Sequence, residues 1–274
     1  MHRPEKTDLT KQVESIPGWF SHQDQAIFEI LLAYQNSINL LGDLLEIGVY
    51  LGKSAVVLGA YRKRDEEVVV CDLFLNASNS EHNDDENSFS YSDLTRPTFE
   101  RNYQRARGEL PRILECSSLN LGSNLKNQKF RFIHVDGSHL YEIVKHDLDF
   151  AIDALISQGG IIVMDDFRAQ HTIGVSSSLW KAIFDGKLQP IIFSAAKAYL
   201  VPLGDKTIDI YEVQQSLLKA GLSTECLDFF PTEALRVLGL SDSDLYNQNS
   251  RLTWWIPPVL LHRVKRFISF FQKS

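Results

Sequence analysis

The sequence predicts an α/β protein with a doubly wound, mostly parallel sheet. The first observation is a series of largely apolar runs at residues 44–47, 68–71, 130–135 and 161–164. The second is that segments with helical periodicity separate these runs. Strands that are apolar on both faces and alternate with helices are typical of a parallel sheet covered on both sides. With 274 residues, the chain is long enough for one large domain of this class and an appendage.

The first elements can be assigned in chain order. Residues 1–16 are polar, as mobile chain ends often are. Ser21 can cap a helix over residues 23–37, because apolar residues recur there at helical spacing. The first strand follows at 44–47, and the next helix begins at Ser54.

The remaining elements alternate up to about residue 204. Residues 75–97 lack an apolar period and predict a long loop or lid. Two strand patterns within residues 190–201 predict a closing hairpin, which makes one strand antiparallel. We therefore expect a seven-stranded sheet in a domain over residues 1–204. The other expected elements are a strand at 68–72, a helix at 97–107, strands at 113–116 and 130–136, a helix at 144–155, a strand at 161–166 and a helix at 176–185.

Residues 205–274 differ from the rest of the chain and predict a helical C-terminal extension. Their short helical patterns are broken by Pro231, Asn247 and a later proline pair. A final helix at residues 260–271 carries apolar residues on one side and basic residues on the other. Such a helix can lie on a membrane surface, or it can dock on the domain or on a second subunit of a homo-oligomer.

Composition excludes several classes of protein. The formal charge of −7 argues against nonspecific binding of nucleic acid. Cys71, Cys116 and Cys226 are widely spaced, which predicts reduced, buried thiols and no disulfide framework. The N-terminus is polar, and no apolar run is long enough to span a membrane. We therefore expect a cytoplasmic enzyme or binding protein.

The most informative stretch runs from Glu46 to Ser54, with the sequence EIGVYLGKS. An apolar run ends in an acid, two glycines follow, and a helix pattern begins. This order predicts the strand, turn and helix that open a βαβ unit. Gly48 and Gly52 would let the main chain approach a ligand closely. The carboxylate of Glu46 would repel a pyrophosphate and attract a cation, such as a sulfonium or an amino-acid ammonium group.

Two nucleotide-binding motifs resemble this stretch without matching it. The dinucleotide fingerprint is not met, because Val49 and Tyr50 stand where it needs further glycine. The phosphate-binding P-loop needs four residues between its glycines, and only three separate Gly48 from Gly52. A plain strand-to-helix turn without a ligand is the remaining alternative.

Carboxylates are expected to gather at one edge of the sheet, because parallel strands end on the same side. Asp136 ends one strand, and Asp165 and Asp166 end its expected neighbour. Like charges this close are costly unless a cation lies between them, and Mg²⁺ prefers such oxygen ligands. His139 follows in the next turn and could act as a general base. The full set of strand-end acids is Glu46, Asp72, Asp136, Asp165 and Asp166.

Each of these residues also has a structural alternative. Asp72 can accept the ribose hydroxyls of a nucleoside, or it can be a cap or turn residue. Asp136 and Asp166 can cap the helices that follow them, and His139 can be a surface residue of a turn. An apolar strand that ends in Asp165 also occurs in nucleotide hydrolases.

The motifs together resemble a known family. The stretch from Glu46 to Ser54 resembles the first motif of class I S-adenosylmethionine-dependent methyltransferases, in the form found in catechol O-methyltransferase. The run Asp136-Gly-Ser-His139, with the pair Asp165-Asp166, is similar to the metal and base motifs of macrocin-type sugar and cephalosporin-pathway O-methyltransferases. The resemblance covers residues 17–203 and implies a Rossmann-like fold.

The resemblance also implies roles for individual residues. S-adenosylmethionine would be the cofactor, and Mg²⁺ or another divalent cation would be held by Asp136, Asp165 and Asp166. His139 would be the base. The first motif would bind the methionine part of the cofactor, Asp72 the ribose, and the two serines the adenine. The implied cofactor-binding residues are Glu46, Gly48, Tyr50, Gly52, Ser54, Asp72, Ser117, Ser118 and Asp136.

The predicted function is methyl transfer from S-adenosylmethionine to a hydroxyl oxygen of a small molecule, such as a sugar, a glycoside or another natural product. The metal would lower the pKa of that hydroxyl, and His139 would remove its proton. Three alternatives stay open. They are a P-loop-like nucleotide hydrolase that depends on Lys53, a nicotinamide enzyme, which Glu46 disfavours, and a noncatalytic S-adenosylmethionine-binding module.

Overall fold

The computed structural model describes residues 8–74, 94–229 and 232–239. Its strands are β1 (Asp43–Ile47), β2 (Val68–Asp72), β3 (Arg112–Glu115), β4 (Phe130–Val135), β5 (Ile161–Met164), β6 (Leu188–Phe193), β7 (Ala198–Pro202), β8 (Ser223–Phe229) and β9 (Thr232–Gly239). Its helices are α1 (Asp8–Glu14), α2 (His22–Ser37), α3 (Lys53–Tyr61), α5 (Arg96–Arg107), α6 (Leu121–Asn124), α7 (Tyr141–Ala154), α8 (Ile173–Phe184), α9 (Ile210–Lys219) and the short 3-10 helix η1 (Ser118–Asn120).

The described strands form one sheet in the order β3-β2-β1-β4-β5-β7-β6-β9-β8. Strands β1 to β5 pair in parallel, whereas β7 is antiparallel to both of its neighbours, β5 and β6. The predicted α/β class, with a mostly parallel sheet and a closing antiparallel hairpin, is therefore confirmed.

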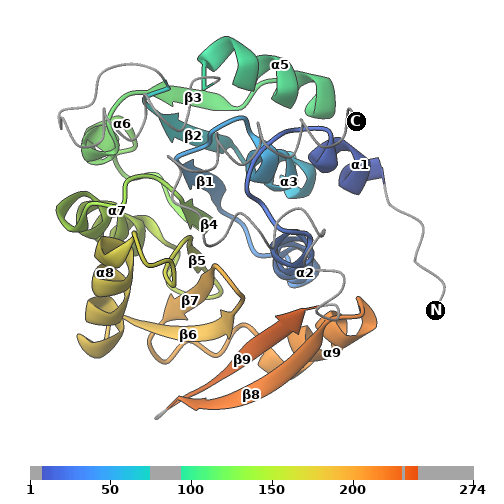
Figure 1. Ribbon diagram of the computed structural model, residues 1–274, viewed down its shortest axis with the longest axis vertical. Helices are drawn as coiled ribbons and strands as arrows, with labels where there is room; N and C mark the ends of the chain where they lie inside the picture. Colours follow the sequence, from blue (N-terminus) through green and yellow to red (C-terminus); the bar gives the residue numbers. More distant parts are fainter. Residues whose placement is uncertain (1–7, 75–93, 230–231, 240–274) are drawn as a thin grey trace, which may run out of the picture.

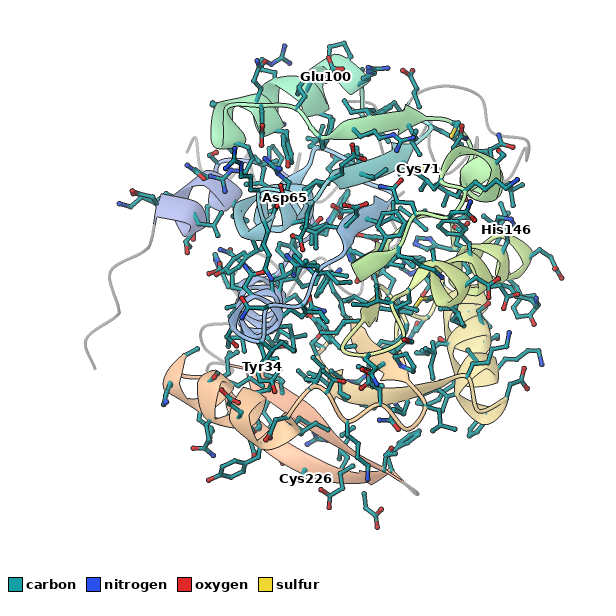
Figure 2. The ribbon with its side chains drawn as sticks, turned by 180° about the vertical axis from the view of Figure 1, so that it is seen from behind. Tyr34, Asp65, Cys71, Glu100, His146 and Cys226 are labelled. Carbon is teal, nitrogen blue, oxygen red and sulfur yellow. The ribbon has the colours of Figure 1, made fainter. Side chains whose placement is uncertain are left out.

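Helices cover both faces of the sheet (Figure 1). Helices α1, α2 and α3 lie on one face, and α6, α7 and α8 lie on the other. Figure 2 shows the same division, with Tyr34 of α2 and His146 of α7 on opposite sides. Neighbouring residues of β4 enter the two cores, since Phe132 packs under α2 and Ile133 packs under α7. Among the described helices, none has the length and hydrophobicity needed to cross a membrane.

The sheet continues beyond residue 204, which differs from the expected helical extension. Helix α9 buries Val213 and Leu217 in the core that also contains α2. Strand β9 then pairs in parallel with β6, and β8 pairs antiparallel with β9. The expectation of seven strands was wrong, because the described residues form nine. The final helix expected at 260–271 and most of the loop expected at 75–97 lie outside the described residues.

The expected polar chain end also contains a short helix. Helix α1 places Val13 in the core beside α2, and Ile16 follows it there, each with 1% of its surface exposed. These buried residues pack the segment against the core beside α3.

The three cysteines are free thiols, as the sequence predicts. Cys71 on β2 is buried and Cys116 is half-buried. Cys226 differs from the expectation of burial, because β8 is the outer strand of the sheet and leaves it exposed (Figure 2).

A buried ion pair fixes the start of β4. Arg131 is fully buried, and its guanidinium group donates to both carboxylate oxygens of Glu66, at 2.8 and 2.9 Å. It also donates to Gln35 Oε1 of α2 at 2.9 Å and to the carbonyl oxygen of Tyr61 at 3.0 Å. A bidentate pair with further hydrogen bonds offsets the cost of burying both charges. Strand β4 is thereby tied to α2 and to the end of α3.

Candidate active site

The turn after β1 packs directly against the turn after β4. Gly48 has φ +80°, and a Cβ at this position would meet the carbonyl oxygen of Asp136 and lie 2.7 Å from Gly137 Cα. Gly52 has φ +91° and begins α3, where a Cβ would lie 2.9 Å from the ring of Phe99. These two positions require glycine because of neighbouring protein atoms, which differs from the ligand approach assumed from the sequence.

Asp72 holds this turn through its carboxylate. Its Oδ2 accepts hydrogen bonds from the main-chain N–H groups of Val49, at 2.7 Å, and Tyr50, at 3.2 Å. Its Oδ1 accepts from the N–H of Phe74 at 2.7 Å. Burial raises the pKa of Asp72, and these N–H groups oppose the rise. The turn-forming role of Asp72 is therefore present, and the contact with a ribose stays a prediction.

Glu46 is fully buried at the end of β1, where its carboxylate is only half satisfied. Its Oε1 accepts hydrogen bonds from the hydroxyl of Ser54 and from His134 Nδ1, the latter at 2.8 Å. Its Oε2 is buried and has no hydrogen-bond partner. Burial raises the pKa of Glu46 to about 8, although the Ser54 hydroxyl and the charge of Lys197 oppose the rise. A buried oxygen without a donor is costly, so this atom can receive a donor from a ligand.

His134 links Glu46 to a buried lysine. The register of β1 and β4 places His134 opposite Glu46. On the other side of the ring, Nε2 lies 3.2 Å from Lys197 Nζ. Because an ammonium group has only donors, Nε2 accepts from Lys197, and Nδ1 carries the proton that is donated to Glu46. Burial and the charge of Lys197 hold the pKa of His134 well below its usual value, so the ring is neutral.

Lys197 is buried among the carboxylate of Asp165, the ring of His134 and the ring of Phe20. It has 1% of its surface exposed, and its Nζ forms an ion pair with Asp165 Oδ2. The same Nζ lies 5.7 Å from the centre of the Phe20 ring. Burial alone would lower the pKa of Lys197, but the charges of Asp165, Asp136 and Asp24 outweigh burial and raise it. Lys197 is therefore charged.

A pocket between the ends of β4 and β5 contains His139 and the strand-end acids. Its polar lining consists of Asp136, Ser138, His139, Asp165 and Asp166, above the apolar side chains of Val144 and Met164. The sequence predicts that these acids and His139 converge, and the structure brings them together here. Asp136 and Asp165 are hydrogen-bonded to each other, which requires a shared proton. Burial and the charge of Asp165 raise the pKa of Asp136 well above its usual value.

Asp166 is directed at His139 within this pocket. Its main chain has φ +52°, which is uncommon for a residue other than glycine. Its Oδ2 lies 3.5 Å from His139 Nε2, and the His139 ring is 84% buried with 16% of the side chain exposed. Burial opposes ionisation of Asp166, but the hydrogen bond and charge of His139 outweigh it, so the pKa of Asp166 lies below its usual value. A carboxylate that orients a histidine is a common feature of general bases.

The three aspartates do not form a set of metal ligands. In the described part of the chain, the His, Cys, Asp and Glu side chains whose donor atoms approach within 4.8 Å as a group of three are Glu46, His134 and Asp136. Both ring nitrogens of His134 already have hydrogen-bond partners. This group is therefore part of a buried row of hydrogen bonds that runs from Ser54 through Glu46 and His134 to Lys197. Asp165 has Lys197 as its cation.

Residues 45–167 match a protein family described as a methyltransferase domain. The prediction that this protein is a methyltransferase is thereby confirmed. A comparison with curated proteins finds no match.

Solved structures share the fold of this methyltransferase domain. The O-methyltransferase NovP is 17% identical over 66% of this chain and 79% of its own, with a TM-score of 0.51. The calicheamicin methyltransferase CalS11 is 15% identical over 72% and 90% of the two chains, with a TM-score of 0.50. The O-methyltransferase TomG from Streptomyces achromogenes, solved in complex with S-adenosylmethionine, is 15% identical over 73% and 91%, with a TM-score of 0.50. The predicted Rossmann-like methyltransferase fold is confirmed.

The two serines expected near adenine already have protein partners. Ser117 caps η1 by accepting from the N–H of Leu119 at 3.4 Å. Ser118 donates a hydrogen bond to Asp147 of α7, whose side chain is buried. Contact of either serine with adenine stays a prediction.

Two residues of the candidate site were missed in the sequence, and both are buried. His134 and Lys197 connect the turn after β1 with the pocket at β4 and β5. A histidine inside a mostly apolar strand, two residues before Asp136, was a signal for the first. The hairpin turn that contains Lys197 was recognised, but the sequence does not show that its lysine points inward.

Replacing Asp147 by asparagine is expected to change how stability depends on pH. Burial raises the pKa of Asp147 to about 6, although Ser118 and His146 oppose the rise. Because the folded state binds this proton more tightly, ionisation lowers stability as pH rises from the unfolded pKa to about 6. At about 1.4 kcal/mol per pKa unit, the variant should gain up to about 3 kcal/mol over the wild type between pH 4 and pH 7.

Urea unfolding curves at several pH values measure this difference. Asp153→Asn is the matched control, because Asp153 lies on the same helix and is exposed. Its stability should follow the wild type at every pH. If Asp147→Asn also runs parallel to the wild type, then Asp147 does not titrate as stated.

Proposed function

We propose that this methyltransferase domain transfers a methyl group from S-adenosylmethionine to a hydroxyl oxygen of a small molecule. The observation that carries the proposal is the main-chain contact of Gly48 with Asp136 and Gly137. This contact puts the turn expected to hold the methyl donor beside the pocket that contains His139 and Asp166. A donor site and a candidate base are therefore neighbours, which methyl transfer requires.

The residues of the first motif fit the charge of the proposed cofactor. S-adenosylmethionine carries an ammonium group and a sulfonium centre, and both are cations. Glu46 Oε2 is a buried acceptor without a donor, at the end of the strand that leads into the turn. An ammonium N–H would satisfy this atom and favour the ionised form of Glu46. Ser54 and Asp72 hold the carboxylate and the turn in place.

In the proposed mechanism, His139 removes the proton from the acceptor hydroxyl. When bound, S-adenosylmethionine would supply the methyl group to this oxygen with loss of its carbon–sulfur bond, and S-adenosylhomocysteine would be the other product. Asp166 orients the His139 ring and stabilises it once it is protonated. Alignment of oxygen, methyl group and sulfur supplies much of the remaining acceleration.

Magnesium was expected from the sequence, but the residues present do not fit it. The three aspartates are not gathered as ligands, and Asp165 is paired with Lys197. We therefore derive no step through a metal, and its involvement stays a prediction from the family resemblance.

A sugar, a glycoside or another natural product is the proposed acceptor class. Support comes from the names of the proteins with the same fold, which include a calicheamicin methyltransferase and an O-methyltransferase involved in tomaymycin synthesis. The family resemblance also implies an aliphatic hydroxyl group, because His139 stands at the base position, which is a histidine in the macrocin-type sugar enzymes and a lysine in catechol O-methyltransferase.

Ligand-linked stabilisation tests the cofactor. S-adenosylhomocysteine is expected to raise Tm in a concentration-dependent way, whereas ATP and NAD should leave Tm unchanged. Stabilisation by ATP that is lost in Lys53→Ala would instead support a nucleotide hydrolase, and stabilisation by NAD would support a nicotinamide enzyme. A screen of hydroxylated acceptors for methylated product then separates an enzyme from a noncatalytic binding module.

A further inference from the structure

The strongest unexplained feature is a charged lysine buried beside the acids of the proposed acceptor pocket. We propose that Lys197 takes the place of a divalent cation in this site. Its ammonium group holds the Asp136–Asp165 pair, and through His134 it also holds Glu46 at the donor side. Lys197 is then a positioning residue, and the site binds no stoichiometric metal. This inference rests on the proposed function for its meaning, but its test does not require turnover.

The main chain fixes the place of the lysine. The N–H of Lys197 donates to Ser194 Oγ at 2.8 Å, and its carbonyl accepts from the N–H of Ser194 at 2.9 Å. This turn joins β6 to β7, and β7 pairs with β5, which leads to Asp165. The ring of Phe20 covers the ammonium group from the side of α2. The pairing of the strands thus holds the ammonium group beside Asp165, and burial keeps it away from water.

The ammonium group of Lys197 gives its partners what a bound metal ion would give them, namely a positive charge close to the acids. One N–H goes to Asp165 Oδ2 and another to His134 Nε2. Asp136 Oδ2 lies 3.8 Å from the same His134 nitrogen, and the Asp136 side chain is hydrogen-bonded to Asp165. A buried lysine is rare unless acids compensate it, and buried acids this close need a cation. The buried acids compensate the charge of Lys197, and Lys197 compensates the charge of the acids.

A divalent cation at the aspartates would compete with this arrangement. It would have to displace the ammonium group from Asp165 or lie beside it, and like charges repel strongly in a buried site. Asp166, the third expected ligand, is directed at His139. The arrangement therefore leaves Asp166 to orient the candidate base.

The row also joins the two halves of the site. Ser54 and His134 Nδ1 donate to Glu46, and His134 Nε2 accepts from Lys197. Removing the ammonium group would remove the donor that sets this tautomer of His134. Loss of Lys197 should therefore weaken cofactor binding as well as freeing Asp165.

Mn²⁺ binding measured by electron paramagnetic resonance tests the inference, together with the metal content of the purified wild type. The wild type is expected to contain no stoichiometric metal and to bind Mn²⁺ no better than Asp165→Asn. Lys197→Met should bind Mn²⁺ at least about tenfold more tightly, since tenfold is the change that 1.4 kcal/mol produces. This gain should disappear in Lys197→Met/Asp165→Asn. Lys187→Met is the control, because Lys187 is exposed and pairs with Asp149, and it should behave as the wild type.

Two results would overturn the inference. One is a wild-type Mn²⁺ site of unit stoichiometry that Asp165→Asn abolishes. The other is a folded Lys197→Met protein with no gain in Mn²⁺ affinity. If Lys197→Met does not fold, the wild-type comparison decides, and Lys197→Arg, which keeps the charge, should remain free of metal. Binding of S-adenosylhomocysteine to the wild type, measured by calorimetry, reports separately on the proposed function.

Discussion

Replacement of His139 by alanine is expected to lower kcat by about 10²- to 10⁴-fold, the range that a general base usually contributes. The Kd for S-adenosylhomocysteine should stay at the wild-type value. The reason is that His139 lies with Asp166 in the pocket at the ends of β4 and β5, outside the row formed by Ser54, Glu46 and His134. Single-turnover methylation of an acceptor found by screening gives the first quantity, and calorimetry gives the second.

His171 provides the matched control for this prediction. Its ring centre lies 5.8 Å from that of His139, and the residue is exposed. His171→Ala should therefore keep kcat close to the wild type. A loss of cofactor affinity in His139→Ala that matches its loss of turnover would assign His139 to the donor site. An unchanged kcat would remove it from the mechanism.

Gly48→Ala is expected to destabilise the protein by about 2–5 kcal/mol, which is a large part of the stability of an ordinary domain. Overpacking against main-chain atoms costs about 1–3 kcal/mol, and a left-handed backbone costs a non-glycine residue about 1–2 kcal/mol more. Both apply here, because Gly48 has φ +80° and its Cβ would lie 2.7 Å from Gly137 Cα. Neither main-chain segment can rotate away as a side chain would. Urea denaturation followed by circular dichroism measures the loss.

Two other glycines separate the two costs. Gly108 has φ +81° but nothing within 4 Å of an added Cβ, so Gly108→Ala should show the backbone cost alone. Gly122 has neither feature, so Gly122→Ala should be neutral or slightly stabilising. If Gly48→Ala costs no more than Gly108→Ala, then the contact between the two turns is looser than described.

Much of the fold could be predicted because its central strands have a clear sequence pattern. Strands β1, β2, β4 and β5 consist mostly of apolar residues, so their positions can be read from the sequence. Strand β8 was missed because one side of it is in water and its sequence, STECLDF, is mostly polar. An outer strand buries too few side chains to leave a strong pattern, and only its pairing with β9 defines it.

The candidate site divides in the same way. The acids at strand ends were predictable because parallel strands end on one edge, and this rule needs no knowledge of side-chain contacts. The partners of those acids were not predictable. His134 meets Glu46 through the register of two strands, and Lys197 meets Asp165 through a hairpin 32 residues further along the chain. The sequence does not distinguish a charged side chain that points into the core from one on the surface. Its role is therefore known only once its packing is known.

The buried pair of Arg131 and Glu66 has a consequence for variants selected at random. It clamps one end of β4. The other end presents His134, about 10 Å away, and leads to Asp136, about 17 Å away, at about 3.3 Å per residue. A strand is stiff along its length. A shift of Arg131 along the strand direction would therefore move His134 and Asp136 relative to the pocket. Screens for inactive variants should therefore recover substitutions of Arg131 and Glu66 as well as substitutions in the pocket, although this ion pair lies far from the pocket.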